Sequence, residues 1–258
     1  MLCQFTVKNF KSIRDEVTFD MQAAAISEHE DRIIIDKDEQ KYLPVSAVYG
    51  PNGGGKSNVL AALHTLVAKV LRPLLATEDS EEKVLLQRKI IVEPFAFSKS
   101  KDEPTEFELF FRTTVSEYRY ILHVKRDIVL YESLDRVKLE TGRKSALFTR
   151  DENGIVLKGA FAKLKVSDEL SKTLTLLSYL GIAYKGNAVV KDVLSWFEYG
   201  IEFLNYGNPI QELKMAVSTS EDVKKLMLQM IQEMDLDIVD FRVEEKENER
   251  INIFTKHC

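Results

Sequence analysis

The sequence has few of the residues that build disulfide frameworks, metal sites or membrane spans. Its two cysteines, Cys3 and Cys258, lie at opposite ends of 258 residues, which excludes a disulfide scaffold and indicates a reducing, cytoplasmic compartment. The four histidines are scattered, and none stands at metal-ligand spacing from a cysteine or an acid. No stretch approaches the roughly 18 consecutive apolar residues of a membrane span, so we expect no membrane association.

Positive charge is also in deficit. The chain has 36 Lys and Arg against 41 Asp and Glu, a net charge of −5, which argues against a basic surface that coats nucleic acid. DNA binding through a local patch is possible but has no support from the charge. With 45% hydrophobic and 30% charged residues the composition is that of a soluble globular protein, and the length suits one α/β domain with an insertion. There is no internal repeat and no low-complexity tract.

Hydrophobic spacing predicts strands early in the chain and helices later. Residues 3–8 and 15–21 are expected to form two strands joined by a polar turn at 9–14, and 91–131 shows further strand patterning. A turn at 151–154 predicts a hairpin between 146–148 and 155–157. Residues 166–234 are expected to be mostly helical.

A phosphate-binding motif stands between a predicted strand and a predicted helix. The motif GxxxxGK[ST] is complete, and its residues are Gly50, Pro51, Asn52, Gly53, Gly54, Gly55, Lys56 and Ser57. Residues 44–49 before it have strand character. Apolar residues after it recur at helical spacing from Ser57 to about Leu71, where Pro73 is expected to end the helix. By chance the fixed positions would occur in roughly 1% of chains this long.

Each residue type in this motif has a chemical reason. The glycines let the backbone curl so that successive N–H groups point at phosphate oxygens, and the following helix adds the positive end of its dipole. Lys56 supplies a charge for the β- and γ-phosphates, and the Ser57 hydroxyl is suited to ligate Mg²⁺. The sequence therefore predicts a site for a nucleoside triphosphate, ATP with Mg²⁺.

Other segments make the chain similar to a known family. The run from Phe5 through Asn9 and Phe10 to Ile13, followed by the loop from Val48 to Asn58, resembles the start of ABC-type ATPases of the RecF/SMC/OLD branch. Within that branch the chain is most similar to AAA-family ATPases of bacterial phage-defence operons, both RloA-like proteins and partners of Toprim or other nuclease effectors. Weaker matches at 93–97, 104–108, 117–120, 192–197 and 238–241 extend the resemblance along nearly all of the chain.

The resemblance implies further contacts with the nucleotide. In this branch the residues after the Asn-Phe pair lie beside the nucleotide, which implies that Lys11 and Ser12 contact phosphate or ribose, with Asn58 completing the site after the loop. A plain surface turn between two strands is the alternative.

Three elements that the family uses for hydrolysis are not visible in the sequence. These are a Ser-Gly-rich signature, a strand that ends in Asp-Glu and a histidine switch. Asp240 follows an apolar pair but is continued by Phe241 and Arg242, so it is expected on the wet face of a strand. We therefore expect these residues to be the amino-terminal part of a longer protein; half of a site shared with another chain is the alternative.

Three features outside the loop allow two interpretations. The aromatics Phe107, Phe111, Tyr118 and Tyr120 are expected in a β-subdomain core, with base stacking on nucleic acid as the alternative. Trp196 is expected on a buried helix face, with a partner-binding patch as the alternative. His64, on the helix after the loop, is expected to be a packing or surface residue rather than a catalyst.

The predicted fold is α/β, with a P-loop ABC-type core, an antiparallel β-lobe and a helical insertion without the heptads of a coiled coil. We expect an ATPase head at 1–160, the insertion at 161–235 and a strand returning to the head at 236–258.

The predicted function is a sensor ATPase that dimerises with itself on nucleotide and controls an effector, such as a nuclease, in anti-phage defence. Lys56 is its catalytic residue. A scaffold that binds ATP without turnover and a RecF-like repair ATPase are the alternatives. The defence role rests wholly on the resemblance.

Overall fold

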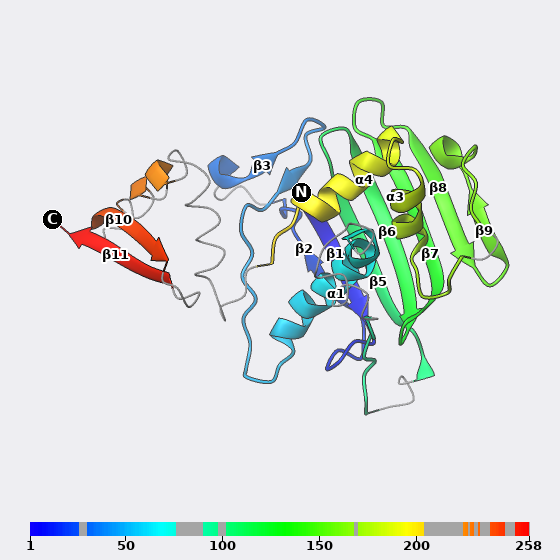
Figure 1. Ribbon diagram of the computed structural model, residues 1–258, viewed down its shortest axis with the longest axis horizontal. Coiled ribbons are helices and arrows are strands. Elements are labelled where there is room, and N and C mark those ends of the chain that lie inside the picture. Colours follow the sequence, from blue (N-terminus) through cyan, green and yellow to red (C-terminus); the bar gives the residue numbers. More distant parts are fainter. Residues whose placement is uncertain are drawn as a thin grey trace. The chain divides into compact units, whose positions relative to one another are not determined.

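The computed structural model describes residues 1–25, 30–75, 90–97, 102–167, 170–203, 238–245 and 251–257, together with 224–226, 228, 229 and 232 (Figure 1). The chain divides into two units, Met1–Glu202 and Phe203–Cys258. The P-loop, the large sheet and the helices α1, α3 and α4 all belong to the first unit.

A seven-stranded antiparallel sheet forms the centre of the first unit, in the order β2-β1-β5-β6-β7-β8-β9. Its strands are β1 (Leu2–Lys8), β2 (Val17–Asp20), β5 (Thr105–Arg112), β6 (Ser116–Lys125), β7 (Ile128–Lys138), β8 (Lys144–Asp151) and β9 (Gly154–Leu157). Residues alternate between a buried and a wetter face, as the pleat requires. Phe5 lies opposite Leu109, and Leu109 lies opposite Tyr120, so the buried face is continuous across three strands.

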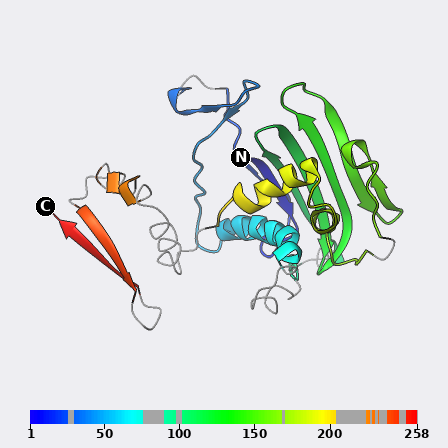
Figure 2. The ribbon, with the colours of Figure 1, turned by 45° about the horizontal axis from the view of Figure 1, so that its top comes forward.

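Three helices cover that face of the sheet: α1 (Lys56–Leu75), α3 (Leu176–Ala183) and α4 (Ala188–Tyr199). Figures 1 and 2 show all three on the same side of the strands. The smaller elements are η1 (Glu30–Arg32), η3 (Gly159–Phe161) and a separate hairpin of β3 (Ile34–Ile35) with β4 (Lys41–Tyr42). The α/β class and the large antiparallel β-lobe are thus confirmed.

Helix α1 is long and apolar enough to cross a bilayer by length and composition alone. Core helices of globular proteins pass the same test, and α1 buries Ala62, Leu63, Leu66 and Val70 within the unit. Its outer face carries the exposed His64, which agrees with the expected surface position.

An aromatic cluster joins α4 to the sheet. Phe111 lies 4.6 Å from the ring centre of Trp196 and 5.5 Å from that of Phe197, and both α4 rings are at most 2% exposed. The Tyr118 hydroxyl donates to Asp192 of α4 at 2.7 Å. The expected core role of these aromatics is confirmed, and the alternatives of base stacking and of a Trp196 partner patch are wrong because the rings are covered.

A buried carboxylate fixes α3 on the sheet. Glu132 of β7 is fully buried, and its oxygens accept hydrogen bonds from the N–H groups of Leu176 and Leu177 and from the hydroxyl of Tyr120. The Glu132 carboxylate thus caps the first turn of α3 from strand β7 by accepting from two of its N–H groups. Burial raises the pKa of Glu132, and the three donors act in the opposite direction.

Two sequence expectations for the P-loop region are corrected. Residues 44–49 form no strand, because within the described part of the chain no neighbouring strand pairs with them, and Val45 is 77% and Tyr49 90% exposed. Pro73 does not end α1, which continues to Leu75. A proline in the last turn removes only a late backbone bond, to the carbonyl of Lys69, while Leu66 and Val70 keep the helix packed.

The second unit contains a hairpin of β10 (Ile238–Glu245) with β11 (Ile251–His257). Asp240 lies exposed on β10 and pairs with Lys224 at 3.1 Å, which agrees with the expected wet-face position. Helical residues are described at 224–226, 228, 229 and 232. Much of the range 166–234 that the sequence predicts as helical, including 204–223, lies outside the described residues.

Replacing Glu132 with glutamine should lower the free energy of unfolding by about 1–3 kcal/mol, because one acceptor oxygen becomes an NH₂ group that faces buried donors. Urea unfolding measures the change. Glu152→Gln, in the exposed β8–β9 turn, is the control and should change stability by less than about 0.5 kcal/mol. Equal effects of the two changes would show that the Glu132 cap does not hold α3.

Candidate nucleotide-binding site

The loop 50–57 has the backbone conformation that a phosphate cradle requires. Helix α1 starts at Lys56, so the loop ends in free helix N–H groups. Gly53 (φ 79°) and Gly55 (φ 85°) adopt left-handed conformations, which side chains other than glycine rarely take. A Cβ on Gly54 would lie 3.0 Å from the Pro51 carbonyl oxygen, so this position is also tight. The curled loop therefore depends on its glycines.

The Lys56 ammonium group folds back over the loop. Its Nζ donates to the carbonyl oxygens of Gly50 at 2.7 Å and Pro51 at 2.8 Å. These neutral acceptors are weaker partners for a cation than phosphate oxygens. Among the described residues no carboxylate pairs with Lys56, so its charge stays available for an anion.

A buried asparagine shapes the amino-terminal turn beside the loop. Asn9 is 1% exposed and has a positive φ of 56°. Its side chain donates to the carbonyls of Glu103 and Pro104 and accepts from the N–H of Phe95. Asn9 thus joins the turn to two distant segments. The sequence named Asn9 only as part of a resemblance, because its partners lie 86 to 95 residues away.

This turn places Ser12 against the P-loop. The Asn58 side-chain amide donates to the Ser12 hydroxyl at 2.6 Å, and a Cβ built on Gly55 would lie 3.1 Å from the same oxygen. Lys11 is differently placed: its N–H donates to the Glu93 carbonyl, and its ammonium lies 5.5 Å from the centre of the Phe10 ring. Ser12, Gly55 and Asn58 therefore form one local group.

The hairpin of β3 and β4, which precedes the P-loop in the sequence, is anchored by Arg112. Arg112 of β5 binds Asp36 at 2.9 Å and Asp38 at 2.6 Å, and Glu117 at 2.7 Å, and its guanidinium lies 5.2 Å from the Tyr42 ring centre. The hydrogen bonds from the Arg112 guanidinium lower the pKa of Asp38. These contacts fix β3 and β4 at the sheet margin, seven residues before Tyr49, although nothing in the motif pointed to Arg112.

Together, Lys56, the N–H groups of the loop and Ser57 can hold a triphosphate and its metal ion. Lys56 and the N–H groups of the loop supply positive potential, and the exposed Ser57 hydroxyl at the start of α1 is an oxygen donor of the kind Mg²⁺ prefers. Within the residues that the structure describes, no three His, Cys, Asp or Glu side chains are grouped to hold a metal. Magnesium here would depend on Ser57 and on the phosphates themselves.

Gly55→Ala should reduce stability more than Gly53→Ala, because both glycines have similar positive φ angles but only position 55 faces a neighbouring atom, the Ser12 oxygen. The difference should be about 1 kcal/mol in thermal unfolding of the free protein. Adding Ser12→Gly to Gly55→Ala should restore part of it. Identical melting of the two alanine variants would mean that Ser12 is not packed on the loop.

The P-loop domain matches a known protein family. A search of curated proteins found none that matches this chain. A family model described as "AAA domain, putative AbiEii toxin, Type IV TA system" matches residues 45–190, more than half of the chain, from the approach to the P-loop into α4. The match thus includes both the loop and the β-lobe. The chain belongs to this family of AAA domains and carries a P-loop ATPase domain.

Proposed function

We propose that this protein binds ATP with Mg²⁺ and works as a nucleotide-driven switch that dimerises and controls an effector in anti-phage defence. The observation that carries the proposal is the P-loop itself, a curled glycine loop at a helix start. Its Lys56 ammonium group donates only to carbonyls among the residues that the structure describes. The family match, whose description names a putative toxin of a toxin–antitoxin system, supports the defence role.

In the proposed complex, Lys56 exchanges its two carbonyl partners for β- and γ-phosphate oxygens. The N–H groups of Gly53, Gly55, Lys56 and Ser57 bind the same phosphates, while that of Gly54 stays bonded to the Pro51 carbonyl. Ser57 supplies a ligand to Mg²⁺. Pro51 and Asn52 form the outer curve of the loop. Ser12, bonded to Asn58, contributes a hydroxyl at the edge of the site, and the exposed Lys11 adds a positive charge to the same turn.

Hydrolysis requires a group that orients the attacking water as well as a phosphate cradle. Among the described residues no carboxylate contacts Lys56 or Ser57. The water-orienting group would therefore come from outside the described residues, either from this protein or from a second copy. This fits the resemblance to RecF/SMC/OLD and RloA-like ATPases, which implies that two ATPase heads enclose the nucleotide.

Apolar side chains beside the loop support the proposed dimer. Val45 and Tyr49 precede the loop at 77% and 90% exposure, and Leu60, in the first turns of α1, is 54% exposed. Exposed apolar groups gathered around one site are typical of surfaces that another chain covers. A partner effector such as a nuclease would respond to the nucleotide-dependent pairing of heads.

A scaffold that binds ATP without turnover is the second candidate, and the lack of a carboxylate next to Lys56 in the described residues favours it. ATP that stays intact for hours on the purified protein would select this candidate. A RecF-like repair ATPase is the third, and stimulation of turnover by DNA ends or gaps would select it.

Lys56→Ala should weaken ATP binding at least about tenfold, because it removes the charge that faces the phosphates. Isothermal titration with ATP and Mg²⁺ measures the affinity. Lys144→Ala, an exposed lysine at the start of β8, is the matched control and should bind like wild type. Unchanged affinity in Lys56→Ala would refute the assignment of the phosphate site.

A non-hydrolysable ATP analogue should raise the mass in solution from that of one 29.6 kDa chain to that of two. Tyr49→Arg should prevent this shift while nucleotide binding persists, because a charge replaces a ring that is 90% exposed. Light scattering coupled to size exclusion measures the mass. A wild-type mass that is independent of nucleotide would rule out the proposed dimerisation.

A further inference from the structure

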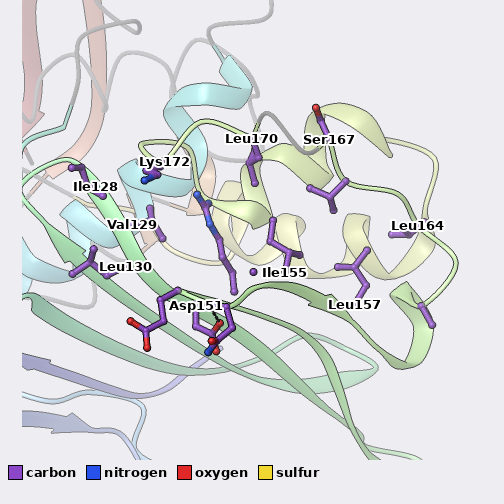
Figure 3. Close-up of a pocket in the computed structure, with 16 residues that line it drawn as sticks. Ile128, Val129, Leu130, Asp151, Ile155, Leu157, Leu164, Ser167, Leu170 and Lys172 are labelled. Atoms are coloured by element: carbon purple, nitrogen blue, oxygen red, sulfur yellow. Dashed lines mark hydrogen bonds between the residues drawn. The ribbon is translucent and has the colours of Figure 1, made fainter.

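A cavity of about 1230 Å³ lies in the β-lobe, lined by residues of β7, β8, β9, the β8–β9 turn and the described stretches 162–167 and 170–172 (Figure 3). Its residues belong neither to the P-loop nor to the amino-terminal turn. The volume is above the roughly 300–1,000 Å³ typical of small-molecule sites, so a ligand would not have to fill it completely.

The walls of this cavity combine aliphatic side chains with polar and charged ones. Figure 3 shows Ile155 and Leu157 of β9 near Leu164 and Leu170 of the covering segment, with Leu130 at the β7 side. Leu130 is 44% exposed although its strand is central in the lobe. The aliphatic side chains favour an apolar ligand body, since each buried CH₂ contributes to binding.

One charged side chain of the cavity lining is buried. Arg150 of β8 is only 8% exposed, and its Nη atoms donate to the backbone carbonyls of Leu174 at 2.7 Å and Ser171 at 3.1 Å. Among the described residues it forms no salt bridge, and its Nε–H makes no hydrogen bond. Glu132 lies opposite Arg150 across β7 and β8 and interacts with its charge, but no hydrogen bond joins the two. Within the described residues this guanidinium therefore has no hydrogen-bonded anion, which buried cations normally have.

The acids near this guanidinium are otherwise engaged or lie at the rim. The Glu132 carboxylate interacts with the Arg150 charge, but three other donors already bind its oxygens. Asp151 accepts a bond from the Asn153 N–H within the turn, and Glu152 is exposed. Lys172 also lines the cavity. The rim acids would repel a doubly charged head more than a singly charged one.

We propose that this cavity is a binding site for a small monocarboxylate with an aliphatic body, whose head pairs with Arg150 while its chain lies against Leu130, Ile155 and Leu157. A guanidinium and a carboxylate match in charge and in planar geometry. The site is separate from the proposed nucleotide site.

Octanoate is the probe, and 1-octanol, which has the same chain length without the charge, is its control. Ligand-observed NMR titration of the full chain should show octanoate binding at least about tenfold tighter than octanol. Lys56→Ala should bind octanoate like wild type. The octanoate result therefore does not depend on whether the P-loop binds nucleotide. Equal affinities for the two probes, or no octanoate binding at about 1 mM, would overturn the proposal.

Two variants locate the site. Leu130→Trp should weaken octanoate binding at least about tenfold by filling the cavity. Val156→Trp, on β9 at a similar 51% exposure but outside the cavity lining, should not. Arg150→Met should remove the preference for octanoate over octanol; because it also loses two carbonyl bonds, its melting temperature is measured alongside. Octanoate affinity unchanged by Leu130→Trp would place the ligand elsewhere and refute the site.

Discussion

The ammonium group of Lys69 ties the P-loop helix to three separate segments of the chain. Its Nζ donates to the carbonyl of Asp127 at 2.9 Å, with those of Thr173 and Ile90 at 3.4 and 3.5 Å. Lys69 is 6% exposed, and a buried ammonium is costly unless it stays hydrogen-bonded. Helix α1 therefore cannot move away from the β6–β7 turn or from the start of α3 without breaking these bonds. Since the P-loop leads directly into α1, the bonds that hold α1 on the β-lobe also fix the position of the loop.

The amino-terminal turn supplies the second constraint on the loop. Asn9 bonds the turn to residues around 95 and 104, and Ser12 reaches Asn58 from the same turn. The loop is thus held by its helix on one side and by the turn on the other. The approach at 44–49 has no such support among the described residues, and its apolar side chains are exposed. The proposed partner surface lies where the site is least enclosed.

Local patterns predicted the elements that local physics determines. The β8–β9 hairpin follows from a turn sequence between apolar runs, and α3 and α4 lie in the range 166–234 that was expected to be mostly helical. The P-loop follows from glycine spacing and from the helix that Lys56 starts. The strand at 44–49 failed because an apolar run becomes a strand only when a neighbour accepts its hydrogen bonds. The prediction that Pro73 ends α1 was wrong because the packing of the helix outweighs the one backbone hydrogen bond that proline cannot donate.

The sequence by itself determined the phosphate loop, the alternation of the sheet and the helix that follows the loop, because each depends on contacts between residues a few positions apart. Only the tertiary structure decided which distant groups meet. The Ser12–Asn58 bond joins residues 46 apart, and the Glu132 cap on α3 joins residues 44 apart. Only the structure also shows that Arg150 lines a cavity and lies opposite Glu132 without a hydrogen bond between the two side chains. Burial and pairing across the sheet determine the charge environment of these groups, and the spacing of residues along the sequence does not predict that environment.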